Sequence, residues 1–102
     1  MRVWLDDERE IRPGFDVWVK TAHEAIDLLK TGRVTFISLD HDLGEPHCGT
    51  GYDVVVAIER LVFEEEIQMP EYALHTANPV GRERMRRALE NAKQFADKNT
   101  GR

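Results

Sequence analysis

Residues 34–42 read Val-Thr-Phe-Ile-Ser-Leu-Asp-His-Asp, a largely apolar and β-branched run that ends abruptly in polar residues. Such a run is typical of a strand in the middle of a parallel sheet, where other elements cover both faces. The pattern predicts a strand from Val34 to Leu39. The polar residues Asp40, His41 and Asp42 then follow directly at its carboxyl end.

Three further short strands are predicted around this central one. Residues 2–5 form an apolar run that stops at Asp6-Asp7, and residues 15–19 alternate between apolar and polar side chains. Residues 72–74 form a last short strand that leads into His75. Polar residues of catalytic type therefore follow three of the four predicted strands.

Three helical segments complete the pattern. Thr21 and Thr50 each have an acidic residue three positions on, which is the spacing of a capping box, and Asn78 precedes a proline that suits a first helical turn. We therefore expect helices to begin at these three residues. The apolar stripe of the third helix reaches Phe95, and we expect residues 97–102 to be a polar, frayed tail.

The order strand, strand, helix, strand, helix, strand, helix indicates a parallel sheet with helices packed against it. The 102 residues allow one domain with a modest core. We predict a single α/β domain over residues 1–102, a small three-layer fold of the flavodoxin-like or Rossmannoid type. Its short, mostly parallel sheet has about four strands.

Composition narrows the classes of partner. The formal charge of −5 gives no overall field for holding nucleic acid, so we expect no duplex DNA partner. No segment approaches the length of a transmembrane helix, and no signal peptide is evident at the start. One cysteine, Cys48, cannot form an internal disulfide, which suits a reducing cytoplasm. The sequence does not indicate an oligomeric state.

The carboxylates at the strand ends predict a metal site. Ligands of such sheets bind beyond the carboxyl ends of the strands, and neighbouring strands lie about 4.8 Å apart. If the first and third strands are neighbours, four carboxylates crowd together, those of Asp6, Asp7, Asp40 and Asp42. Two charges about 6 Å apart repel by roughly 3 kcal/mol at an effective dielectric constant near 20, so the cluster needs a counter-charge.

We expect that counter-charge to be a divalent cation held by these four aspartates. Oxygen ligands favour Mg²⁺ or Mn²⁺, and an added histidine would admit Zn²⁺. For Asp7 and Asp42, capping of a turn through their own backbone is an equal alternative. Arg9 is a second possible source of positive charge at the cluster.

The histidines and the last helix suggest phosphate chemistry. His41 and His75 follow different strands and resemble an acid/base pair. Cations at a helix amino terminus oppose the macrodipole, so a bound anion would explain Arg82. We expect Asn78, Arg82 and Arg9 to bind the oxygens of a phosphate group.

The chain resembles a receiver domain of two-component signalling, but an altered one. Leu5-Asp6-Asp7 is similar to the acidic first strand end of receivers, and Ser38-Leu39-Asp40 is similar to the strand that carries the phosphoacceptor. By this resemblance Asp40 holds the nucleophile position. Only a short connection joins the first two strands, where a receiver has a full helix, and no counterpart of the receiver lysine follows a fifth strand.

A closer resemblance covers nearly the whole chain and is to the cyclic-phosphate processing receiver-like domains. The stretches that carry it are residues 4–9 with 13–14, 38–44, 49–53 and 75–82. The resemblance implies a receiver-like fold and hydrolysis or other processing of a cyclic phosphate, on a nucleotide or an RNA end.

Together these features predict a metal-dependent phosphoesterase that acts on a cyclic nucleotide or on an RNA 2′,3′-cyclic end. The four aspartates would hold the cation, while His41, His75 and Asp40 would carry out the chemistry. The alternative is a non-catalytic receiver-like module that is phosphorylated on Asp40, or that binds and sequesters a nucleotide.

Overall fold

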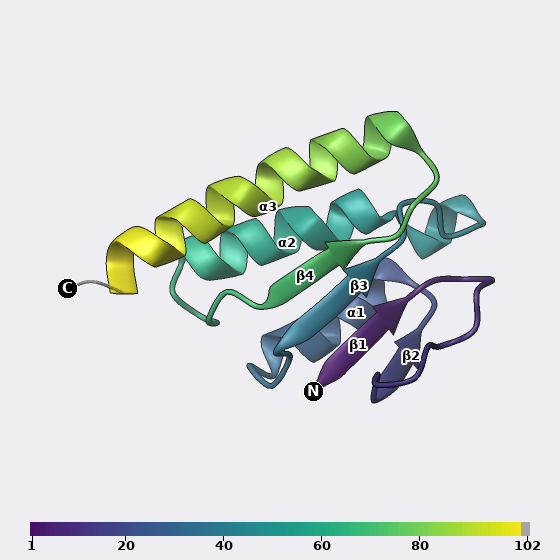
Figure 1. Cartoon of the computed structure of the whole chain (residues 1–102), viewed down its shortest axis with the longest axis horizontal. Coiled ribbons are helices and arrows are strands. Elements are labelled where there is room, and N and C mark those ends of the chain that lie inside the picture. The colour runs from purple at the N-terminus through teal and green to yellow at the C-terminus, as the bar shows by residue number, and fades with distance from the viewer. Residues whose placement is uncertain (101–102) are drawn as a thin grey trace.

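The structure, a computed structural model, describes residues 1–100. Figure 1 shows its elements along the chain. They are, in order, β1 (Arg2–Leu5), β2 (Val17–Val19), α1 (Ala22–Lys30), β3 (Phe36–Leu39), the 3₁₀ turn η1 (Pro46–Cys48), α2 (Gly51–Phe63), β4 (Glu71–Leu74) and α3 (Pro79–Thr100). The predicted α/β class, with a short sheet of four strands, is confirmed.

The four strands form one parallel sheet in the order β2-β1-β3-β4. The first and third strands are therefore neighbours, as the flavodoxin-like order requires. The register pairs Leu5 with both Val19 and Leu39, and Leu39 with Leu74. The strands thus end at the same level, and the residues that follow them meet at one edge of the sheet.

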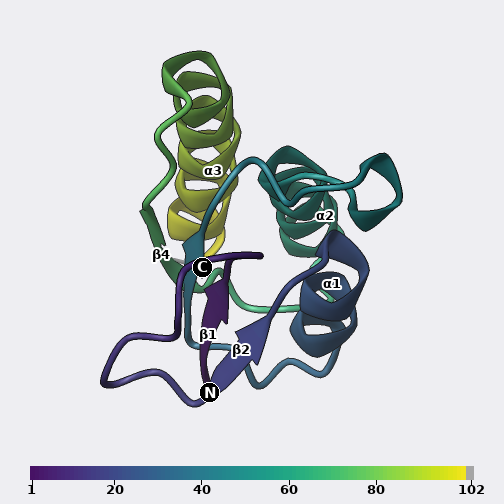
Figure 2. The ribbon, with the colours of Figure 1, turned by 90° about the vertical axis from the view of Figure 1, so that its right-hand side faces the viewer.

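The two faces of the sheet are covered differently. All three helices lie on one side, where they bury Val3, Leu5, Ile37 and Leu39 in a continuous core (Figure 2). The connection between β1 and β2, residues 6–16, lies on the other side. This third layer is irregular rather than helical. A helical crossover between parallel strands needs a dozen or more residues, and the connection over residues 6–16 is shorter and also contains Pro13-Gly14.

Aromatic packing holds that irregular layer in place. The ring of Phe15 packs edge-on against Trp4 and Phe36, at centroid distances of 5.2 and 5.8 Å. The guanidinium of Arg2 lies over both phenylalanine rings, and its Nε donates to the carbonyl of Gly14. The loop therefore shields this face of the sheet without a helix.

The helix starts agree with the sequence, and one helix end does not. The side chains of Thr21 and Thr50 cap α1 and α2, and Asn78 accepts a hydrogen bond from the first turn of α3. We expected a frayed tail from residue 97, but α3 continues to Thr100. Residues 101–102 lie outside the described part.

No helix within residues 1–100 has the length and apolar character needed to cross a membrane.

Candidate functional site

Three side chains from three strand ends form the centre of the site. Asp6, Asp40 and His75 are the first residues after β1, β3 and β4, and their backbone amides continue the sheet ladder with N···O distances of 3.0 or 3.1 Å. Because of this shared register, one ligand atom from each side chain lies within 4.8 Å of the others. Two carboxylates and an imidazole therefore converge on one point.

Asp6 is the buried member of this cluster, with 1 % of its surface exposed. Its Oδ1 accepts hydrogen bonds from the backbone amides of Glu8 and Arg9, both at 2.8 Å, so Asp6 has the turn-capping role that we considered for Asp7. Its Oδ2 lies 3.0 Å from Nε2 of His75. Burial alone would raise the pKa of Asp6, but these hydrogen bonds outweigh it and hold the pKa below its usual value.

Contacts with several residues hold the side chain and the backbone of His75 in place. Its ring stacks on Trp4 with a centroid distance of 4.1 Å and an interplanar angle of 2°. Its Nδ1 lies 2.8 Å from the hydroxyl of Ser38, and its carbonyl accepts from Arg9 at 2.6 Å. Burial lowers the pKa of His75, and the neighbouring Asp6 offsets this only in part. The ring is therefore neutral near pH 7, the form that binds a metal.

A cavity of about 320 Å³ opens beside this cluster. It is lined by all four aspartates of the sequence prediction and by Glu8, Arg9, Gly44, Thr76 and Ala77. Asp40 is partly exposed there, and among the described residues its Oδ1 accepts only from the next amide, that of His41. The predicted crowding of carboxylates is therefore present, with Asp6 at the buried end and Asp42 at the exposed end.

The two histidines of the predicted acid/base pair have separate surroundings. His41 is not among the residues that line the cavity; its Nδ1 lies 2.9 Å from Oδ1 of Asp42. Its ring lies against Gly81 of α3, where an added Cβ would meet ring atoms at 2.5 to 2.9 Å. His75, by contrast, belongs to the carboxylate cluster, which favours a role as a ligand over a role as a mobile proton donor.

The three predicted phosphate-binding residues also differ in their surroundings. Oδ1 of Asn78 accepts from the amide of Gly81 and so caps α3. Arg9 lines the cavity while it donates to the carbonyl of His75. The guanidinium of Arg82 is exposed and has no hydrogen bond or ion pair with other residues of the range 1–100. Neighbouring arginines are engaged, in ion pairs or in a cation–π contact: Arg84, Arg86 and Arg87.

Sequence analysis assigned no role to Ser38 and Trp4, which hold the ring of His75. The two residues are paired across β1 and β3 and lie on the face opposite the helices. A signal for Ser38 was present, because it is the only serine of the chain and interrupts an apolar strand. A lone hydroxyl at a buried strand position needs a hydrogen-bond partner, and here the partner is the histidine.

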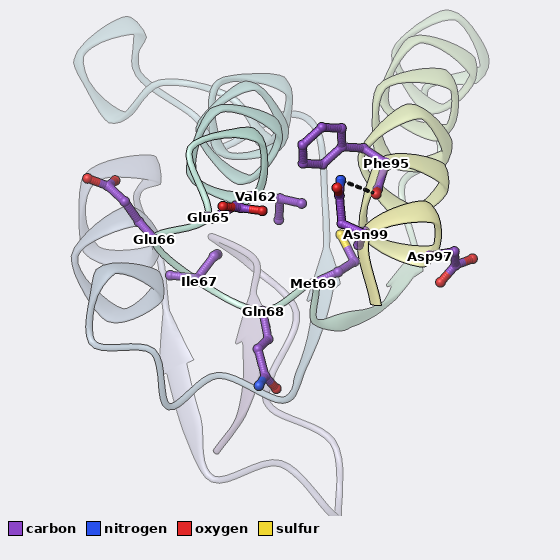
Figure 3. A pocket seen from close by; sticks show the side chains of 10 residues that line it. Val62, Glu65, Glu66, Ile67, Gln68, Met69, Phe95, Asp97 and Asn99 are labelled. Carbon is purple, nitrogen blue, oxygen red and sulfur yellow. Dashed lines mark hydrogen bonds between the residues drawn. The ribbon is translucent and has the colours of Figure 1, made fainter. Parts of the chain in front are cut away.

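A larger cavity lies elsewhere. It measures about 550 Å³ and lies between the end of α2, the loop that follows it and the last turns of α3 (Figure 3). Its walls include Val62, Ile67, Met69 and Phe95, with glutamates at the rim. Among the described residues, its lining includes no histidine or cysteine and none of the strand-end carboxylates, so it does not share their chemistry.

The donor set of the cluster fits a divalent cation. Carboxylate oxygens and a neutral imidazole are ligands that Mn²⁺, Fe²⁺ and Zn²⁺ accept, and carboxylates alone suit Mg²⁺. Oδ1 of Asp6 is held by two amides, which leaves Oδ2 as its ligand atom toward His75. Asp40 supplies the second, less constrained carboxylate.

Comparison with protein families agrees with this geometry. The sequence model of the family described as Cyclic-phosphate processing Receiver domain matches residues 1–91. The chain belongs to this family. This match confirms the resemblance to cyclic-phosphate processing receiver domains that the sequence motifs predicted. No curated protein and no solved structure matches it.

Proposed function

We propose that this receiver domain is a metal-dependent phosphoesterase that opens the ring of a cyclic phosphate, on a cyclic nucleotide or on an RNA 2′,3′-cyclic end. The observation that carries the proposal is the convergence of Asp6, Asp40 and His75 within 4.8 Å beside a cavity lined with further carboxylates. Membership of the cyclic-phosphate processing family supports the substrate class.

In this proposal the ligands come from the three strand ends. Asp6, Asp40 and His75 hold the cation, and Asp7 and Asp42 complete the negative rim of the cavity. A bound divalent cation supplies Lewis-acid stabilisation of the charge on the phosphate oxygens. The two backbone amides on Asp6 keep its carboxylate ionised and oriented before any ligand arrives.

The remaining residues bind the phosphate and move the proton. Arg9 and Arg82 supply positive charge for the non-bridging oxygens, and Asn78 orders the helix amino terminus that faces the anion. His41 exchanges a proton with the attacking water or the leaving oxygen, and Asp42 orients its ring through Nδ1. Nε2 of His41 is therefore the atom through which the proton is exchanged.

The test is ring opening by metal-stripped protein to which one metal is returned at a time. The substrates are 2′,3′-cyclic nucleotides, 3′,5′-cyclic nucleotides and an RNA with a 2′,3′-cyclic end, and Mg²⁺, Mn²⁺ and Zn²⁺ are added singly. We expect metal-dependent opening of at least one substrate, seen by chromatography, and its loss in His75→Ala. Turnover that is equal with and without metal would refute the proposal.

Gly81→Ala tests the role of His41. The new methyl group occupies space now filled by the imidazole, so the ring has to rotate away from Asp42. Misplacement of a reacting group by about 1 Å costs on the order of a hundredfold in rate, and we expect a loss of roughly that size. Helix propensity favours alanine over glycine by up to about 1 kcal/mol, which offsets the cost of displacing the ring. The melting temperature should therefore change little.

The readouts for Gly81→Ala are turnover and the nuclear magnetic resonance signals of the His41 ring. Val80→Ala is the matched control, because it changes the preceding position of the same helix turn, where the side chain is 70 % exposed. Normal turnover in Gly81→Ala together with a displaced His41 ring would remove His41 from the reaction.

One observation supports a second candidate function. Of the two carboxylates in the strand-end cluster, Asp6 is buried and Asp40 is partly exposed, so a phosphoryl donor can reach Asp40. In this alternative the domain is a module phosphorylated on Asp40, or one that holds a nucleotide unchanged. Incubation with acetyl phosphate distinguishes them: a stable adduct of about 80 Da that is absent in Asp40→Asn would favour phosphorylation. Tight binding of a nucleotide that is released intact would favour sequestration.

A further inference from the structure

A hydrogen-bonded chain of Ser38, His75 and Asp6 crosses the sheet beneath the proposed metal site. The hydroxyl of Ser38 is 2.8 Å from Nδ1 of His75, and Nε2 of the same ring is 3.0 Å from Oδ2 of Asp6. Ser38 is only 3 % exposed and does not line the cavity. Its hydroxyl therefore cannot reach a substrate as a nucleophile, and among residues 1–100 its only hydrogen-bond partner is His75.

The ring between Ser38 and Asp6 has little freedom to turn. Trp4 covers one face of it in a parallel stack at 4.1 Å, and Arg9 holds its backbone carbonyl at 2.6 Å. A ring flip would place ring carbons where the two nitrogens now lie and would break both hydrogen bonds inside a mostly buried site. Each nitrogen of His75 thus keeps one fixed partner.

The chemistry of the partners assigns the proton. The ionised Asp6 carboxylate only accepts hydrogen bonds, so Nε2 of His75 is the donor, and Nδ1 accepts from the hydroxyl of Ser38. A cation bound by Nε2 needs the lone pair of that nitrogen. The single ring proton must then reside on Nδ1, which becomes a donor and needs an acceptor.

We propose that Ser38 is a positioning residue that lets His75 exchange ring tautomer when its Nε2 binds a cation. A hydroxyl both donates and accepts, so rotation of one O–H bond serves either form without movement of the ring. The ring carries one proton before and after the exchange. This inference rests on the proposed function, since it assumes that His75 is a metal ligand.

Zinc binding by metal-stripped protein tests the inference, because Zn²⁺ is diamagnetic and accepts imidazole ligands. We would measure the affinity by calorimetry and the tautomer from the ¹⁵N resonances of the His75 ring. The variants are Ser38→Ala, which removes the hydroxyl, and Ser38→Thr, which retains it. Val34→Ala is the control, because it removes buried apolar volume just before the start of β3, at the opposite end of that strand from the site.

We expect the proton on Nε2 without zinc and on Nδ1 with zinc in the wild type. Ser38→Ala should weaken zinc binding by about tenfold or more, the usual effect of losing the outer partner of a ligating histidine. Ser38→Thr should recover most of the zinc affinity. Val34→Ala should lower the melting temperature and leave the zinc affinity unchanged. A merely structural role for Ser38 would give the Val34→Ala result.

Two failures can be told apart. If the wild type and Ser38→Ala bind zinc equally tightly through His75, the role of Ser38 is overturned and the metal site stands. If the wild type binds no zinc, the proposed metal site fails, and the tautomer exchange that depends on it fails as well.

Discussion

The Asp40→Asn variant should lose about a thousandfold or more of the cyclic-phosphate turnover and keep the fold of the wild type. Metal-ion stabilisation supplies several kcal/mol to such reactions, and each 1.4 kcal/mol is a factor of ten. Asparagine removes the charge of this proposed ligand but retains an oxygen that can accept from the amide of His41, as Oδ1 of Asp40 does. The measurements are turnover with saturating metal and thermal unfolding by circular dichroism.

Asp27→Asn is the matched control for this substitution. Asp27 is an exposed aspartate on α1 that pairs with His23, away from the strand ends. The turnover of Asp27→Asn should therefore equal that of the wild type. Asp6→Asn would be a poorer test, because Asp6 also holds the backbone of residues 8 and 9 and its loss affects stability. Near-normal turnover in Asp40→Asn would remove Asp40 from the metal site.

The sheet and the helix starts could be predicted because their signals are local. A β-branched run marks β3, and threonine caps mark α1 and α2 in the three or four residues around them. The end of α3 has no such signal. The polar residues from Asp97 to Thr100 contain no proline or glycine, and the side chain of Asn99 donates to the carbonyl of Phe95 within the helix. Polar character alone therefore did not end this helix.

The site was predictable in its carboxylates but not in the partners of its histidines. Asp6, Asp40 and His75 meet because their strands end in register, and successive residues of a strand point to opposite faces. His75 is the first residue after its strand and His41 the second after its own, so this alternation separates the two side chains. Register across strands is a property of the tertiary structure, and it also brings Ser38 and Trp4 to His75.

Gly51→Ala should cause the largest loss of stability, because this glycine lets the start of α2 touch the backbone of the site. A Cβ at this position would lie 1.9 Å from the carbonyl oxygen of Asp40 and 2.8 Å from Cε of Met85. The side chain of Met85 can move, but the oxygen belongs to the main chain between Asp40 and His41. The amide of Gly51 also donates to the carbonyl of His41 at 2.8 Å, which ties the helix start to the same segment.

Overpacking against a fixed group costs up to about 3 kcal/mol, and we expect a loss of that size for Gly51→Ala. For a domain of this length it corresponds to a drop in melting temperature of roughly 12 to 24 °C. Gly81→Ala is the comparison, because the three atoms nearest to its added Cβ all belong to the side chain of His41, so that variant should lose turnover and keep its stability. A melting temperature of Gly51→Ala equal to that of Gly81→Ala would mean that α2 does not begin against Asp40. The orientation of Asp40, a metal ligand in our proposal, would then need another cause.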